Sequence, residues 1–84
     1  MQMPKLWTEA EVPEGGGTLL KKELYEYHTQ KGEYQIELFE RMNGECYAIA
    51  VPKDDERLIV FGSNITTSKA LALSVVMEKI ERDM

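Results

Sequence analysis

The sequence predicts an α+β domain: a four-stranded antiparallel meander with one C-terminal helix packed on one face. Two short turn signals, at 31–32 and 43–44, separate three strand-length segments in which apolar residues alternate with polar ones. Residues 69–82 follow three hydroxyl-bearing residues and carry apolar side chains at helical spacing. A length of 84 residues fits one small domain.

Residues 1–17 are predicted to be a flexible N-terminal arm, and residues 18–84 the single folded domain. Two prolines and the glycines at 15–17 lie in the arm, which has no periodic apolar pattern. Trp7 is the one large aromatic side chain of this segment. Because a tryptophan is costly to leave in water, we expect Trp7 to dock on the domain or on a partner. A loosely held aromatic is the equal alternative.

Residues 18–28 admit two interpretations. Leu20, Leu24 and Tyr27 have helical spacing, which would give the order α-β-β-β-α. If Lys31-Gly32 is a two-residue turn, however, Tyr25 faces Leu38 and Tyr27 faces Ile36 in an antiparallel pair. This apolar match favours a first strand at about 23–30.

The second and third strands are predicted at 33–42 and 45–52. Asn43-Gly44 between them is the strongest short hairpin signal, because a type I′ turn needs positive φ at both central residues. A two-residue turn there places Leu38 opposite Ile49 and Ile36 opposite Val51. These side chains define the predicted core face of the sheet.

The fourth strand is predicted at 57–62, after a polar loop that contains Asp54-Asp55-Glu56. It brings Leu58 and Val60 onto the predicted core face. The final helix, at 69–82, begins after the capping hydroxyls of Thr66, Thr67 and Ser68. Its core stripe, at 100° per residue, is expected to contain Ala70, Leu73, Val76, Met77 and Ile80.

Two apolar surfaces remain outside this predicted core. On the helix, Leu71 and Val75 lie away from the core stripe. On the sheet, the second face is expected to carry Leu24, Phe39, Ala48, Ala50, Ile59 and Phe61. Six apolar positions on one sheet face indicate that a second copy, another protein or the Trp7 arm covers it.

Little in the sequence points to catalysis or to a bound cofactor. Cys46 is the only cysteine and His28 the only histidine, so neither a disulfide within the chain nor a Cys/His zinc cluster is expected. In the predicted register Cys46 lies opposite Arg41, which would lower its pKa, but a nearby base is missing. The segment 62–69 offers a generic anion site, for which helix capping is the simpler explanation. We expect no enzyme, no cofactor and no metal.

Composition narrows the remaining functions. The net charge of −5 argues against a large surface for nucleic-acid phosphates. No apolar run reaches the ~20 residues of a membrane span, and the N-terminus lacks the apolar core of a signal peptide, so we expect a cytoplasmic protein that does not contact membranes.

The sequence therefore predicts a non-catalytic protein-interaction or regulatory module, homodimeric or bound to another protein. The expected interaction residues are Leu71, Val75, Leu24, Phe39, Ile59, Phe61 and Trp7. The alternative is a single-stranded nucleic-acid-binding domain in which aromatic side chains stack on bases, namely Phe39, Tyr47 and Phe61, with Lys21, Lys22 and Arg41 nearby. A weaker idea is an acidic inhibitor that mimics nucleic acid.

Overall fold

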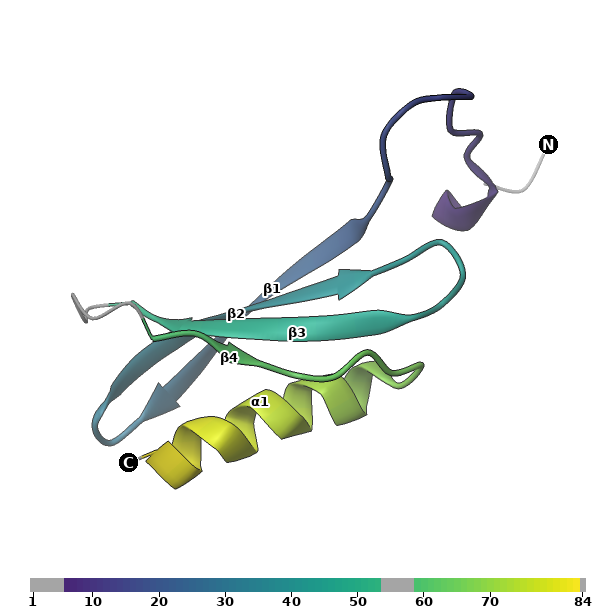
Figure 1. The fold of residues 1–84 in the computed structure, drawn as a ribbon. Coiled ribbons are helices and arrows are strands. Elements are labelled where there is room, and N and C mark those ends of the chain that lie inside the picture. The colour runs from purple at the N-terminus through teal and green to yellow at the C-terminus, as the bar shows by residue number, and fades with distance from the viewer. Residues whose placement is uncertain (1–5, 54–58, 84) are drawn as a thin grey trace, which may run out of the picture.

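The computed structural model of the chain describes residues 6–53 and 59–83. A short 3-10 helix, η1 (Trp7–Glu9), precedes a four-stranded sheet and one helix. The elements are β1 (Lys21–Thr29), β2 (Gly32–Glu40), β3 (Cys46–Pro52), β4 (Phe61–Gly62) and α1 (Lys69–Asp83). All neighbouring strands are antiparallel in the order β1-β2-β3-β4, and α1 runs along one face of the sheet (Figure 1). The predicted α+β meander with a C-terminal helix is confirmed.

The β1–β2 hairpin settles the ambiguity at residues 18–28, since residues 21–29 form a strand and not a helix. The predicted register is wrong by two residues, because Tyr25 lies opposite Ile36 rather than Leu38. The turn closes one residue early: the Thr29 hydroxyl accepts hydrogen bonds from the N–H groups of Lys31 (3.2 Å) and Gly32 (3.1 Å). A threonine hydroxyl can stabilise a turn in this way, and it shifts the turn onto residues 30–31.

The β2–β3 hairpin has a three-residue loop instead of the predicted two-residue turn. The Arg41 N–H donates to the Glu45 carbonyl at 2.7 Å, and the Gly44 N–H donates to the Arg41 carbonyl at 3.0 Å. Gly44 has φ +94°, whereas no non-glycine residue of the described ranges has positive φ, so Asn43 does not adopt the type I′ conformation. A type I turn followed by one glycine in the left-handed region is the usual geometry of such a loop.

This extra loop residue shifts the β2–β3 register by one and exchanges the two faces of β3. Leu38 lies opposite Ala48, and Ile36 opposite Ala50. Ala48 and Ala50 are therefore fully buried under α1, although the sequence placed them on the second face. Ile49 and Val51, predicted to be core residues, point to the other side of the sheet.

The helix α1 packs over β3, β4 and β2 through a stripe that differs slightly from the predicted one. Ala72, Val76 and Ile80 are fully buried, and Leu73 and Met77 pack against the same core. Ala70, predicted to lie in the stripe, is exposed. Ala72 of α1 belongs to the same buried cluster as Ala48 and Ala50 of β3. Small side chains therefore lie on both sides of the contact between helix and sheet.

The fourth strand is shorter than predicted. Among the described residues, only Phe61 and Gly62 of this segment pair with β3, opposite Ala50 and Ile49. Val60 is 62% exposed and does not join the core. The predicted loop at 54–56 and Leu58 lie outside the described residues. A single bridge between Cys46 and Thr66 extends the contact with β3 toward the start of α1.

Candidate interaction surface

The sheet face opposite α1 is the candidate functional surface, and we call it the open face. Strand alternation assigns its residues, because Ile36 and Leu38 are buried under the helix and their neighbours must point the other way. Its apolar members are Leu24, Phe39, Tyr47, Ile49 and Val51. Cross-strand pairs connect them: Phe39 lies opposite Tyr47, and Glu37 lies between Leu24 and Ile49. Neither α1 nor any strand lies over this face, and η1 lies on this side of the sheet beside the β2–β3 loop (Figure 1).

Two aromatic rings lie at one end of the open face. Phe39 and Tyr47 stack with their centroids 5.1 Å apart and their planes 20° from parallel. Both side chains remain half-buried, and Leu24 on the neighbouring strand β1 is 60% exposed. The aromatic pair and the aliphatic side chains form an apolar strip across β1, β2 and β3, in which Glu37 lies between Leu24 and Ile49.

Charged side chains lie beside this apolar strip and, at Glu37, within it, and they form ion pairs with one another. Lys22 Nζ lies 3.3 Å from a carboxylate oxygen of Glu37. Lys53 pairs with Glu26 and lies 3.9 Å from Glu33. The Lys53 ammonium group is the main cause that lowers the pKa of Glu26. An apolar centre with a polar rim is the usual arrangement of a protein-protein interface.

The predicted interaction residues do not all lie on the open face. Leu24 and Phe39 do, as predicted for the second face. The assignment of Phe61 is wrong, because it packs on the helix side against the core, where its ring meets Tyr34 edge-on at 6.1 Å. Ile59 is half-buried and outside the paired residues of β4.

The remaining predicted residues lie on two separate elements, Leu71 and Val75 on α1 and Trp7 on η1. Leu71 is 52% exposed on the outer side of α1, and Val75, one turn later, is half-buried. Trp7 is half-buried in η1. The arm that carries it rises from the start of β1 and returns so that η1 lies beside the β2–β3 loop (Figure 1). Val12 and Leu19 of the arm line a hollow together with Met42 of this loop.

Sequence reasoning missed three residues of the open face as parts of a protein contact: Tyr47, Ile49 and Val51. The order Cys46-Tyr47-Ala48-Ile49-Ala50-Val51 alternates small with large side chains. A helix packs closely on the small side, so the large side chains must occupy the other face. This alternation would have corrected the register of β3.

Cys46 is a core residue with no sign of reactivity. Its side chain is fully buried, and its thiol donates to the Thr66 carbonyl at 3.2 Å. Its strand partner is Glu40 and not Arg41 as predicted. Burial raises the pKa of the Cys46 thiol and the Glu40 carboxylate adds to the effect, which is the opposite of what a nucleophile needs.

The start of α1 is occupied by contacts within the chain. The Ser68 hydroxyl accepts a hydrogen bond from the Leu71 N–H at 3.1 Å, which caps the helix. Lys69 Nζ lies 2.9 Å from Glu40 and 3.4 Å from Glu23, and the hydrogen bond to Glu40 is the first cause that raises the pKa of Lys69. Two carboxylates therefore already bind the Lys69 ammonium group. These contacts favour the interpretation that segment 62–69 caps the helix over the interpretation that it binds an anion.

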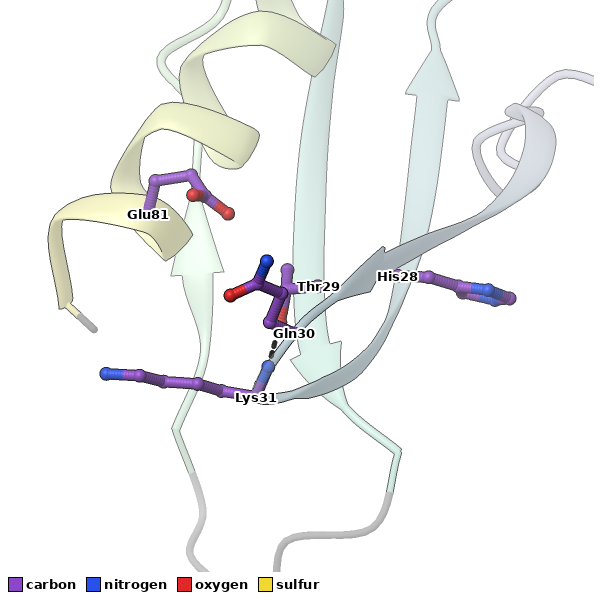
Figure 2. A pocket seen from close by; sticks show the side chains of 5 residues that line it. All are labelled: His28, Thr29, Gln30, Lys31 and Glu81. Atoms are coloured by element: carbon purple, nitrogen blue, oxygen red, sulfur yellow. Dashed lines mark hydrogen bonds between the residues drawn. The ribbon is translucent and has the colours of Figure 1, made fainter.

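A polar hollow lies between the β1–β2 turn and the last turns of α1. Its lining residues are His28, Thr29, Gln30, Lys31 and Glu81. Figure 2 shows the His28 ring pointing away from Glu81. His28 lies 3.7 Å from Glu26, while the Glu81 carboxylate accepts a hydrogen bond from the Tyr27 hydroxyl at 3.1 Å. The two ionisable groups therefore do not converge on a common point.

Comparison with known proteins adds no family to these observations: no family model, no curated protein and no solved structure matches the chain. In residues 6–53 and 59–83, no group of three or more His, Cys, Asp or Glu side chains is placed to hold a metal ion. The described part of the chain contains no helix with the length and apolar character needed to cross a membrane.

Proposed function

We propose that the chain is a non-catalytic protein-interaction module that works as a homodimer, and that the open face is the contact between the two copies. The observation that carries the proposal is the apolar strip of Leu24, Phe39, Tyr47, Ile49 and Val51 on the sheet face that α1 does not cover. Two sheets that pack face to face lie about 10 Å apart, with the side chains of both inner faces interdigitated.

The ion pairs on the open face make it compatible with a second copy in this position. Each copy carries a net charge of −5, so two copies repel each other unless they meet where charges are neutralised. On the open face, Lys22 is paired with Glu37, and Lys53 with Glu26. A second apolar strip covers this face without leaving an unpaired charge at the contact.

The nucleic-acid alternative has weaker support. The Phe39–Tyr47 stack offers an aromatic platform, but Phe61 lies on the helix side. The nearby basic groups are already neutralised: Lys21 lies 3.5 Å from Glu23, Lys22 lies 3.3 Å from Glu37, and Arg41 lies 3.2 Å from Glu45. A phosphate backbone would have to compete with these carboxylates for each cation.

The test of the proposal is the mass in solution of the native chain and of Ile49→Lys, measured by light scattering after size exclusion. Ile49 lies at the centre of the open face and opposite Glu37, so a lysine there can pair with that carboxylate and the fold is retained. The proposal predicts that this variant has half the native mass. Leu71→Lys places the same charge on an apolar site that is 52% exposed on the outer side of α1, away from the open face; it is the control and should keep the native mass. An Ile49→Lys variant with unchanged mass would refute the proposed contact.

A further inference from the structure

No described strand pairs with the outer edge of β1. We infer that a second copy adds to this edge as an antiparallel strand, with a two-fold axis at Leu24. This contact is separate from the face contact proposed above and does not need it. With both contacts, two of the homodimers proposed above join into a tetramer, in which each copy uses its open face for one neighbour and its β1 edge for another.

The orientation of the backbone shows which residues are available at this edge. Arg41 and Glu33 use their backbone groups to pair with β3, as the bonds from Arg41 N–H to the Glu45 carbonyl (2.7 Å) and from Lys53 N–H to the Glu33 carbonyl (3.0 Å) show. The backbone N–H and C=O groups of successive residues in a strand point to opposite sides. Since these groups of Glu33 and Arg41 point toward β3, those of the even-numbered residues of β2 point toward β1. Their partners on β1 are the odd-numbered residues, from 21 to 29. The N–H and C=O groups of Lys22, Leu24, Glu26 and His28 therefore point away from the sheet.

The edge is suited to strand addition. β1 is an outer strand of the sheet, nine residues long, with no proline or glycine within it. Leu24 is 60% and Tyr25 39% exposed, so side chains on both faces of the edge are accessible. A long edge strand with free backbone groups is a template for pairing unless its charges prevent it.

An axis at Leu24, Tyr25 or Glu26 pairs at least seven of the nine residues of β1 with the second copy, and among these registers only the axis at Leu24 sets opposite charges against each other. Outward-pointing residues must meet outward-pointing residues, so the two-fold axis passes through a residue. With the axis at Leu24, Lys22 lies opposite Glu26 of the second copy, and Leu24 lies opposite its own counterpart. An axis at Lys22, Glu23 or Glu26 sets like charges against each other, and an axis at Tyr25 sets Leu24 opposite Glu26. Like charges directly opposite destabilise a strand pair, and opposite charges stabilise it.

The selected register extends ion pairs that already exist in each copy. Lys22 is bound to Glu37, and Glu26 to Lys53. Pairing Lys22 with Glu26 of the second copy joins these into a row of alternating charges, Glu37, Lys22, Glu26 and Lys53, which the two-fold axis repeats. The pairs Lys22 with Glu26 and Leu24 with Leu24 each exchange two backbone hydrogen bonds.

Charge reversal tests this register. In the Ile49→Lys background, which removes the face contact, we compare the solution masses of Lys22→Glu, Glu26→Lys and the double reversal. Ile49→Lys alone should have twice the mass of one chain. Each single reversal sets like charges opposite each other between copies and should halve that mass. The double reversal restores opposite charges between copies and should restore the mass.

The rescue separates the contact between copies from folding. Within each chain, the double reversal still places a carboxylate at position 22 beside Glu37 and an ammonium group at position 26 beside Lys53, so it keeps the intramolecular repulsion of both single variants. Far-UV circular dichroism checks that all variants are folded. If Ile49→Lys alone is monomeric, if the single reversals keep the doubled mass, or if the double reversal stays monomeric, the edge inference is overturned. The face proposal fails separately, when Ile49→Lys and the native chain have equal mass.

Discussion

Phe39 on β2 and Tyr47 on β3 stack face to face on the side of the sheet that α1 does not cover, with ring centroids 5.1 Å apart. Such a pair contributes to the stability of one copy and at the same time presents a flat apolar surface to another molecule. The stack therefore links the fold of the chain to its proposed contact.

Loss of the stack should weaken the fold measurably without destroying it. We expect Phe39→Leu to lower the free energy of unfolding by about 0.5–1.5 kcal/mol, because leucine keeps the apolar area and loses the aromatic pair. Phe39→Tyr keeps a ring at this position and is the matched control. Urea unfolding at a low, fixed protein concentration measures both, and equal midpoints for the leucine and tyrosine variants would show that the ring contact contributes nothing.

Close approach of α1 to β3 should make the alanines of β3 sensitive to added volume. Ala48 and Ala72 are fully buried in one cluster, so Ala48→Leu should lower the free energy of unfolding by about 1–3 kcal/mol through overpacking. Ala70→Leu, an exposed position of the same helix, should change it little. Thermal or urea unfolding compares the two; a tolerant Ala48 would mean that the helix lies farther from β3.

The β2–β3 loop should depend on Gly44. Its φ of +94° lies in a region that disfavours L side chains, although nothing lies within 4 Å of the added Cβ position. We expect Gly44→Ala to lower the free energy of unfolding by about 1–2 kcal/mol from backbone strain alone. Gly17→Ala, which also has open space around the added atom, should have almost no effect. Equal unfolding midpoints would contradict the three-residue loop.

The stability of the domain should fall in acid partly through Glu23. The Tyr25 hydroxyl, which donates to this carboxylate, is the first cause that lowers the pKa of Glu23 below its ordinary value of 4.5, and Lys69 adds to it. A carboxyl whose folded-state pKa is lowered stabilises the fold above the unfolded-state value, and this contribution is lost as pH falls through the folded-state pKa. Glu23→Gln should therefore lose less stability than the native chain as the pH falls below about 5.

Urea unfolding at a series of pH values measures this difference. Glu11→Gln in the exposed arm is the control, and it should follow the native curve. Parallel curves for Glu23→Gln and the native chain would show that Glu23 makes no contribution to acid sensitivity.

The element order and the helix were predictable because they depend on local signals. Hydroxyl caps and apolar spacing located α1 to within a residue at its end, and glycine-containing turns located the first three strands. Strand register was less accessible, because Asn43-Gly44 is compatible with a two-residue or a three-residue loop. One residue of difference moved Ile49 from the predicted core to the open face.

The candidate surface could be predicted only in part, for the same reason. Leu24 and Phe39 were placed on the second face correctly, since an error of two residues in the β1–β2 register leaves the faces unchanged. Phe61 was misplaced because the error of one residue in β3 passed to β4. Which copy or partner covers an apolar face depends on contacts between molecules, and a single sequence does not encode these in any local pattern.

The most direct test of the account is light scattering after size exclusion, over a concentration series, on the native chain, Ile49→Lys and Leu71→Lys. We expect the native chain to be oligomeric, Ile49→Lys to have half the native mass while remaining folded, and Leu71→Lys to keep the native mass. A native chain that is monomeric at every concentration, or an Ile49→Lys variant with the native mass, would contradict the proposal that the open face joins two copies.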